Sequence, residues 1–254
     1  MIKELNHIGL NTGDVEKSID FYVNILGGTI INDARSADGK GRFVYVQLAN
    51  GVIELLKNRP DSPNLGFRHL AYEVDEPIGD VYQKLVDLGY EFTVAPKLGA
   101  SGMEYLAFFK DASGAVFEII ERERKLRIPD LTNPHIKEFH HIGLLVADED
   151  VDTCDAFYLT HMGFSADIVP ADAGQDARYY KLNSDRLKAI RVPEKVAVPL
   201  AHVAFIVEDC AATKAYLESH GITCGDVHIC ERCGSRVMKV EGPDKEKLIF
   251  AEKI

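Results

Sequence analysis

The hydrophobic residues of this chain follow a pattern that occurs four times along its length. Each occurrence begins with a short stretch in which apolar residues flank a histidine: LNHIGLNT, FRHLAYEV, FHHIGLLV and LAHVAFIV. Apolar stretches of this length and composition predict β-strands. The histidines are His7, His69, His141 and His202, so their spacings are 62, 72 and 61 residues. The chain is therefore expected to contain four related units, arranged as two pairs with a longer connection between the pairs.

A helix is predicted after each of these strands. The helical stretches are residues 14–28, 77–90, 150–164 and 209–222, and each contains a glycine near its end. Glycine suits this place because it adopts the left-handed conformation that commonly ends a helix. Short apolar runs with polar or glycine-containing connections follow, for example GRFVYVQLANGVIELL and EYLAFFKDASGAVFEIIE. Each unit thus reads as a strand, a helix and three strands, which predicts an α+β fold.

Length, charge and composition agree with two domains. The chain has 254 residues, and we place the domains at 1–125 and 136–254, with the charged, proline-containing stretch 122–135 between them. The net charge of −11 without a basic stripe argues against nucleic acid as a partner. No apolar run reaches the roughly 18 residues of a membrane span, and MIKELNH lacks the apolar core of a signal peptide. We therefore expect a cytoplasmic protein with no membrane partner.

All five cysteines lie in the second half of the chain. An odd number without a secretion signal favours reduced thiols. The run CGDVHICERCG places Cys224, His228, Cys230 and Cys233 at spacings similar to those of zinc ligands. A structural zinc site and a redox-active Cys-x-x-Cys pair are alternatives, but ordinary core or surface thiols are the favoured interpretation.

Two glutamates interrupt apolar strands in the first half of the chain. Glu54 lies 47 residues after His7, and Glu118 lies 49 residues after His69. Burying a carboxylate is costly unless it is paired with a positive charge or binds a metal ion. Two histidines and two glutamates at matched positions of two related units can share one divalent cation. The sequence therefore predicts a metal site in the first half.

The same offsets in the second half lead to residues that do not bind metals. They reach Lys188 after His141 and Ala251 after His202. A lysine would repel a cation, and alanine offers no ligand atom. An isolated strand histidine is more often an ordinary core or surface residue than a ligand. We therefore expect the second half to hold no metal and to act as a scaffold or to shape the substrate site.

Strand alternation also predicts how the first histidine is oriented. Successive side chains of a strand point to opposite faces. His7 should therefore share a face with Leu5 and Gly9, while Ile8 and Leu10 should face the helix.

The motifs HIGL…DVEKSIDFYVNILG and FKDASGAVFEIIE closely resemble the vicinal oxygen chelate superfamily. That superfamily includes glyoxalase I, methylmalonyl-CoA epimerase, extradiol dioxygenases and fosfomycin- or bleomycin-resistance proteins. The resemblance covers nearly the whole chain as two tandem modules. It implies that two units pair into a curved, eight-stranded mixed sheet, which forms a cup around one metal ion.

The resemblance also implies the ligands and their roles. His7, Glu54, His69 and Glu118 would bind one divalent transition-metal ion per chain, with Ni, Co, Zn, Mn and Fe all compatible. The set looks like that of bacterial glyoxalase I. This resemblance implies that Glu118 of this chain would be both a metal ligand and the base, and that Glu54 would be a ligand and a second base. If the units instead paired across modules, each site would have three ligands: His7, Glu54 and His202, or His69, Glu118 and His141.

Several functions fit such a site. An isomerase, lyase or epimerase that stabilises the enediolate of a small hydroxycarbonyl substrate is favoured. An extradiol dioxygenase would use two histidines and one carboxylate, here His7, His69 and Glu118. A binding or resistance protein without turnover is a third class. Assembly as a homodimer stays open.

The substrate is less well defined by the sequence. Bacterial glyoxalase I carries an arginine four residues after its first histidine, and Asn11 stands there in this chain. A glutathione hemithioacetal is therefore expected to be a poor substrate, and a keto-sugar, a phosphosugar and another 2-hydroxycarbonyl compound are open alternatives. Asn11 and Asn58, which follows Glu54 by four residues, are the candidate substrate-binding residues. Arg35, Arg42 and Arg68 could hold an anionic substrate, although surface roles fit them better.

Overall fold

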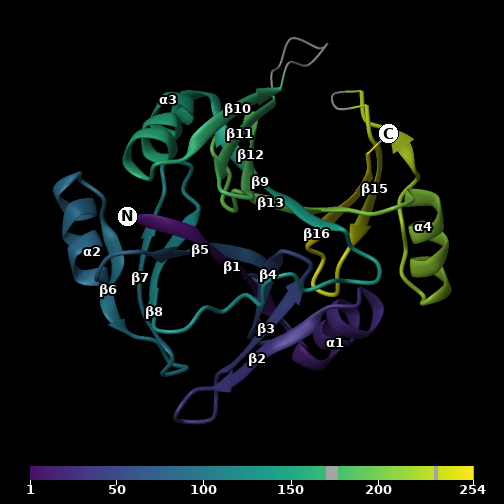
Figure 1. Cartoon of the computed structure of the whole chain (residues 1–254), viewed down its shortest axis with the longest axis horizontal. Coiled ribbons are helices and arrows are strands. Elements are labelled where there is room, and N and C mark those ends of the chain that lie inside the picture. The colour runs from purple at the N-terminus through teal and green to yellow at the C-terminus, as the bar shows by residue number, and fades with distance from the viewer. Residues whose placement is uncertain (170–176, 232–233, 254) are drawn as a thin grey trace.

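The structure is a computed structural model that describes residues 1–169, 177–231 and 234–253. The first half of the chain contains two units with the same order of elements (Figure 1). The first unit is β1 (Ile2–Thr12), α1 (Val15–Ile19), η1 (Asp20–Ile25), β2 (Thr29–Arg35), β3 (Arg42–Leu48) and β4 (Gly51–Lys57). The second unit is β5 (Gly66–Val74), α2 (Ile78–Asp87), β6 (Phe92–Leu98), β7 (Glu104–Lys110) and β8 (Val116–Arg122).

The second half repeats this order. Its first unit is β9 (Glu138–Ala147), η2 (Asp148–Asp150), α3 (Val151–Asp155), η3 (Ala156–His161), β10 (Ser165–Val169), β11 (Ala177–Leu182) and β12 (Asp185–Val192). Its second unit is β13 (Leu200–Ile206), α4 (Cys210–Ser219), β14 (His228–Ile229), β15 (Arg236–Glu241) and β16 (Lys247–Glu252). The predicted pattern of a strand, a helix and three strands is confirmed in all four units.

Each half forms one eight-stranded mixed sheet. The strand orders are β2-β3-β4-β1-β5-β8-β7-β6 and β10-β11-β12-β9-β13-β16-β15-β14. The first strands of the two units pair antiparallel at the centre, β1 with β5 and β9 with β13. The last strand of each unit runs parallel to its first strand. The units therefore pair within each half of the chain, as preferred from the sequence, and the alternative of pairing across the halves is wrong.

The helices begin and end where the sequence indicated. Asp14 starts α1, because its side chain accepts hydrogen bonds from the backbone N–H groups of Glu16 and Lys17. The predicted glycines at the helix ends, residues 27, 89, 163 and 221, all have positive φ angles. The helices after β1 and β9 continue as the π-helical segments η1 and η3. Within the described parts of the chain, no helix is both long and apolar enough to cross a bilayer.

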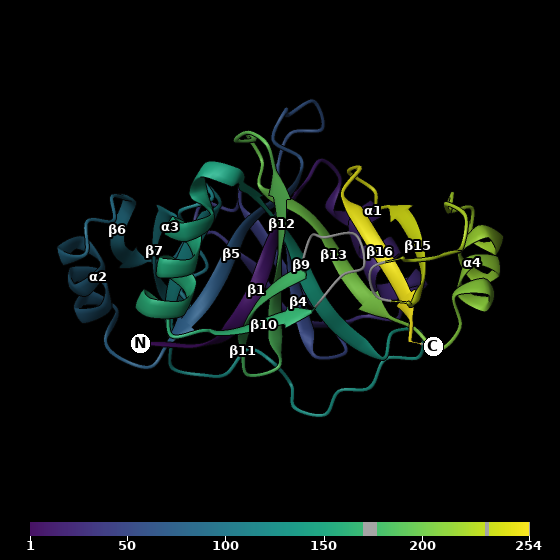
Figure 2. The same cartoon turned by 90° about the horizontal axis from the view of Figure 1, so that it is seen from above.

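The two sheets share a common hydrophobic core, which the first helix of each half helps to build. Phe157 of η3 packs edge-on against Phe117 of β8, with ring centroids 5.4 Å apart. Tyr158 donates a hydrogen bond to the buried Asp111 after β7. In the opposite direction, Tyr22 of η1 donates to Glu246 before β16. Figures 1 and 2 show the resulting arrangement, in which α3 lies beside the strands of the first sheet and α1 lies near β16.

Glu246 is the buried acid of this contact. Its side chain accepts hydrogen bonds from the Tyr22 hydroxyl at 2.6 Å and from the backbone N–H of Asp244 at 2.8 Å. Burial disfavours the charged carboxylate and outweighs these hydrogen bonds, so the pKa of Glu246 rises to about 7. Because this pKa is above its value in the unfolded chain, Glu246 favours folding at low pH, and the contribution is lost as the pH rises through about 7.

We predict that Glu246→Gln reduces the loss of stability at alkaline pH, because glutamine keeps the size of the side chain and cannot ionise. Thermal unfolding at several pH values between acid and alkaline conditions measures this. The midpoint of the variant relative to the unchanged protein should rise with pH. The exposed Glu241→Gln is the control and should follow the unchanged protein. Parallel pH profiles for Glu246→Gln and the unchanged protein would contradict the assignment.

Candidate metal centre

Four neighbouring strands bring together the two histidines and two glutamates predicted to bind a metal. His7 lies on β1, Glu54 on β4, His69 on β5 and Glu118 on β8, and these strands are adjacent in the order β4-β1-β5-β8. Gly9 is opposite both Glu54 and His69 in the sheet. Their exposed fractions are only 1%, 5%, 7% and 3% in chain order. We call the face of the sheet that carries them the first cup.

The side chains of these residues converge on one another. His7 Nε2 lies 3.0 Å from His69 Nε2 and 3.0 Å from Glu54 Oε2. Glu118 Oε2 lies 3.1 Å from His69 Nε2 and 3.5 Å from His7 Nε2. The ligand atoms of His7, Glu54 and His69 all lie within 4.8 Å of one another. The residues selected from the sequence are thus in contact, although they come from four separate strands.

Gly9 is necessary for this convergence. A Cβ atom at residue 9 would lie 1.9 Å from Cε1 of His69, inside the imidazole ring. Because real Cβ contacts are never so short, any other residue would displace the ring. The second half repeats this relation, since a Cβ at Gly143 would lie 2.4 Å from Cε1 of His202. The glycine of the two HIGL motifs therefore provides room for the histidine of the neighbouring strand.

An irregularity in β1 orients His7. The register of β1 against β5 shifts between Leu5 and His7. Leu5 consequently packs in the hydrophobic core with Ile8 and Leu10. The expectation that Leu5 shares a face with His7 is therefore wrong, because a bulge interrupts the alternation of side chains.

The buried Asn6 gains a position beside His7 from this bulge. Its Oδ1 lies 3.0 Å from His7 Nδ1, and its Nδ2 donates to Glu73 Oε2 at 3.3 Å. Lys3 in turn forms an ion pair with Glu73. With Asn6 Oδ1 as acceptor, Nδ1 of His7 carries the proton and Nε2 presents its lone pair to the centre of the cup. Asn6 was not predicted as part of the site, although its position immediately before His7 could have suggested a contact with that ring.

The electrostatics of the cluster are those of mutually compensating charges. Burial lowers the pKa of His69, but hydrogen bonds and charges from Glu118 and Glu54 outweigh it and raise the pKa to about 10. The pKa of His7 also lies above its ordinary value, because Glu54 and Glu118 outweigh the effect of burial there too. Burial raises the pKa of each glutamate, yet the histidines reverse this and hold both carboxyl pKa values below their usual range. Each carboxylate therefore depends on positive charge at the imidazoles or on a cation.

The donor set fits a divalent metal ion. Ligand atoms about 2.1 Å from an ion and at right angles to each other are about 3.0 Å apart. The separations of 3.0 to 3.5 Å between histidine nitrogens and carboxylate oxygens match this spacing. Imidazole nitrogen and carboxylate oxygen together suit Ni, Co, Zn, Mn and Fe. The described residues contain no other such cluster of three or more potential ligands.

The chain matches known proteins along its first half. A sequence profile described as the Glyoxalase/Bleomycin resistance protein/Dioxygenase superfamily matches residues 4–119. A probable lactoylglutathione lyase of Synechocystis sp. is 30% identical over 128 residues, which cover 48% of this chain and 97% of that relative. The chain belongs to this superfamily. The mitochondrial methylmalonyl-CoA epimerase of Dictyostelium discoideum is 27% identical over 132 residues and is covered to 80%.

Solved structures of the superfamily share the fold of the whole chain. A Mn(II)-bound glyoxalase from Novosphingobium aromaticivorans has a TM-score of 0.72 at 17% identity, covering 99% of this chain and 82% of that one. A 2,3-dioxygenase from Pseudomonas sp. KL28 has a TM-score of 0.70 at 14% identity, covering 99% and 93%. The fold of the whole chain, with its two eight-stranded sheets, thus matches that of solved structures.

Aromatic rings and one arginine surround the four residues. Tyr45 meets the His7 ring edge-on at 5.3 Å, and Phe108 meets His69 at 5.8 Å. Arg122 donates to the Tyr45 hydroxyl and lies 5.1 Å from the centre of that ring. Its Nε is buried and has no hydrogen-bond partner among the described residues. Tyr45, Phe108 and Arg122 were not predicted as part of the site, because nothing in the local sequence pattern separates them from ordinary core and surface residues.

The candidate substrate-binding residues lie at the ends of strands β1 and β4. Asn11 donates through Nδ2 to the backbone carbonyl of Asn64, and Asn58 accepts from the backbone N–H of Arg59. Among the arginines considered, Arg42 pairs with acidic side chains, and Arg68 donates to loop carbonyls. These ion pairs and hydrogen bonds agree with the surface roles expected for Arg42 and Arg68. A role of Asn11 and Asn58 in substrate binding stays a prediction.

The corresponding positions of the second sheet carry different chemistry. Lys188 pairs with Gly143 as Glu54 pairs with Gly9, so it occupies the position of Glu54, as the sequence offset indicated. Ile249, and not Ala251, occupies the position of Glu118, because Ile249 pairs with Ala204 as Glu118 pairs with Ala71. The expected equivalence of Ala251 is wrong, since the fourth unit is two residues shorter.

The cysteines do not change this assignment. Cys154, Cys210 and Cys224 are free thiols, and Cys233 lies outside the described residues. Burial raises the pKa of Cys154 to about 12 and that of Cys210 to about 11, so both are unreactive at neutral pH. A zinc site that includes Cys233 stays an untested alternative.

We predict that the purified chain binds about one divalent transition-metal ion tightly and that His7→Ala removes it, because imidazole nitrogen is essential to the set. Elemental analysis after exhaustive dialysis measures the metal content. His141→Ala is the matched control, since it removes the equivalent histidine of the second sheet, and it should retain the ion. Equal metal loss in the two variants, with both folded by circular dichroism, would contradict the assignment.

Proposed function

We propose that the chain is a divalent-metal-dependent enzyme that moves a proton at a carbon next to a carbonyl group, as an isomerase, lyase or epimerase of glyoxalase I type. The observation that carries this proposal is the convergence of His7, Glu54, His69 and Glu118 in the first cup. Two buried carboxylates beside two imidazoles combine the ligands of a cation with a base for proton transfer.

His7, Glu54 and His69 would hold the ion, with Glu118 as a fourth ligand. When bound, a divalent ion acts as a Lewis acid and stabilises negative charge on the substrate oxygens. Asn6 supports this set, because it fixes the tautomer of His7 through Nδ1. Gly9 supports it by leaving space for the His69 ring. Tyr45 and Phe108 surround the histidines with apolar rings, which limits the access of water.

Glu118 is the proposed base. It is not part of the compact set formed by His7, Glu54 and His69, although its Oε2 is 3.1 Å from His69 Nε2. A carboxylate at the margin of the set has oxygen lone pairs available to the substrate carbon. Glu118 would accept the proton from this carbon and return it to the adjacent carbon. Return to the opposite face of the same carbon would instead give epimerisation, with Glu54 as the second acid.

The proposed substrate is a small compound with vicinal oxygens, such as a hydroxycarbonyl. The names of the relatives, a lactoylglutathione lyase and a methylmalonyl-CoA epimerase, support proton transfer as the reaction class. Asn11 stands where bacterial glyoxalase I has an arginine, and an amide cannot replace a charged, bidentate contact with a carboxylate. Arg122 also reaches the cup, but its guanidinium already pairs with the buried Glu104, and only its Nε lacks a hydrogen-bond partner among the described residues.

We predict that Glu118→Gln lowers the rate by about 10²- to 10⁴-fold and retains part of the metal, because the amide keeps one ligand oxygen and cannot accept a proton. The measurement is deuterium incorporation from D₂O, followed by NMR. The panel contains dihydroxyacetone, dihydroxyacetone phosphate, methylmalonyl-CoA and the hemithioacetal of methylglyoxal and glutathione. The hemithioacetal is expected to be the poorest substrate.

Glu54→Gln is the matched comparison for this experiment. It should weaken metal binding more and reduce exchange less, since Glu54 belongs to the compact ligand set. Deuterium exchange at the unchanged rate in fully metal-loaded Glu118→Gln would place the base elsewhere. A metal-loaded wild-type protein that exchanges no member of the panel would argue for a binding protein without turnover.

Ring-cleaving dioxygenation is the second candidate, because His7, His69 and Glu118 form a set of two histidines and one carboxylate. Such triads leave positions for substrate and dioxygen, and Glu54, whose Oε2 lies 3.0 Å from His7 Nε2, would obstruct one of them. We therefore predict that activity persists without dioxygen and with Co or Ni in place of Fe. Oxygen-electrode assays with catechols test this. Oxygen uptake that strictly requires Fe(II) would favour the dioxygenase.

A further inference from the structure

The second sheet keeps the histidine pair of the first and reverses the charge around it. His141 Nε2 lies 3.1 Å from His202 Nε2, close to the 3.0 Å between the histidines of the first cup. Lys188 occupies the position of Glu54, and Ile249 occupies the position of Glu118. We call the face with His141, Lys188, His202 and Ile249 the second cup. At the positions that correspond to Glu54 and Glu118, the second cup has one cation and one apolar side chain.

Two further lysines lie on the same face. Lys239 is directly opposite Ile249 in the sheet, and Lys247 precedes Ile249 by two residues on β16. Burial and then the charges of Lys188, Lys239 and Lys247 lower the pKa of His202 to about 4. The three lysines are therefore close enough to act on His202. Lys188, Lys239 and Lys247 form no ion pair within the described ranges, although Glu241 is the cross-strand neighbour of Lys247.

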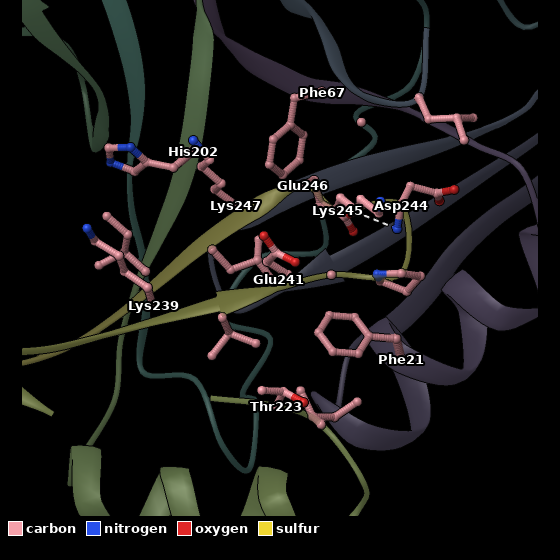
Figure 3. A pocket seen from close by; sticks show the side chains of 18 of the residues that line it. Phe21, Phe67, His202, Thr223, Lys239, Glu241, Asp244, Lys245, Glu246 and Lys247 are labelled. Atoms are coloured by element: carbon pink, nitrogen blue, oxygen red, sulfur yellow. Dashed lines mark hydrogen bonds between the residues drawn. The ribbon is translucent and has the colours of Figure 1, made fainter. Parts of the chain in front are cut away.

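A cavity of about 1170 Å³ is lined by His202, Lys239, Lys247 and Ile249 of the second cup (Figure 3). Figure 3 shows His202, Lys239 and Lys247 at one end of it and Asp244 and Glu246 toward the other. The carboxylates of Asp244 and Glu246 are already occupied by hydrogen bonds to the first half of the chain, from Gly13, Ser18 and Tyr22. Lys239 and Lys247 form no ion pair among the described residues, and the charged side chains of Lys17, Asp20, Glu241 and Lys245 complete the lining of the cavity.

The walls of the cavity next to the lysines are apolar. Leu145, Leu200 and Ile249 come from the second sheet, and Phe67 comes from β5 of the first. A volume of this size holds a ligand as large as a typical metabolite or drug, for which pockets measure about 300 to 1,000 Å³. Apolar walls with a few charged groups at one end favour a ligand whose charge is confined to one end.

We propose that the second cup binds a small organic anion, with its carboxylate or phosphate group against His202, Lys239 and Lys247 and its apolar body along Leu145, Leu200 and Phe67. Ammonium groups bind such anions through short, charge-assisted hydrogen bonds. The neutral imidazole of His202 can add a donor from its buried position. The site is separate from the metal centre and does not depend on the proposed reaction.

Isothermal titration of the full chain with benzoate, phenyl phosphate and the neutral benzyl alcohol tests the proposal. At least one of the two anions should bind with a dissociation constant of about 1 mM or less, weakening with salt, and benzyl alcohol should bind at least about tenfold more weakly. The tighter of the two anions identifies the group that the site accepts.

Variants assign this binding to the second cup. Lys239→Gln combined with Lys247→Gln should reduce affinity for the anion by about tenfold or more, because charge-assisted contacts are lost. Lys97→Gln combined with Lys110→Gln changes the net charge equally on exposed strands of the first sheet and should have no effect. His7→Ala should also bind normally. The proposal is overturned if neither anion binds at about 10 mM, if benzyl alcohol binds equally, if the Lys239/Lys247 variant is unaffected, or if His7→Ala abolishes binding.

Discussion

Two carboxylates and two imidazoles lie together in the first cup, almost completely out of contact with water. Neither Glu54 nor Glu118 could remain ionised there without positive charge within a few ångströms. The histidines supply it when protonated, and under the proposed function a divalent ion would supply it when they are neutral. Protons and the ion would then compete for the same nitrogen lone pairs, which would couple metal binding to pH.

The sheet topology places these groups before any side chain is considered. Antiparallel pairing of β1 with β5 puts His7 and His69 on neighbouring strands, and the parallel strands β4 and β8 add one glutamate on each side. The same topology in the second half brings His141 and His202 equally close. What the second half does not repeat is the compensating charge. There Lys188 stands in place of Glu54, and the two histidines are neutral because burial and neighbouring cations lower their pKa values.

Much of this could be predicted from the sequence, because it depends on periodicity. The four units, their glycine-terminated helices and the convergence of the four polar residues follow from patterns that repeat at fixed offsets. The errors arose where the chain departs from the period. Ile249 was missed because the fourth unit is two residues shorter, and a shift of two leaves every strand side chain on the same face. Alternation therefore could not distinguish Ile249 from Ala251.

The bulge before His7 shows a second limit of the pattern. A bulge adds one residue to a strand, and no local composition marks it here. It removes Leu5 from the cup and places Asn6 beside His7, which creates the hydrogen bond that orients the ligand. Arg122 and Tyr45 were missed for a related reason. Their importance comes from cross-strand contacts that join residues far apart in the sequence.

The cavity of the second half is built by residues from both halves of the chain. Phe67 lies two residues before His69 on β5, yet its ring lines the cavity of the second half. Tyr22 of the first half holds Glu246 at the margin of the same cavity. The second cavity thus has a wall from each half, and neither sheet could form it alone. This cavity lacks the acidic groups of the first cup, and the lysines that line it are the basis of the proposed preference for an anion.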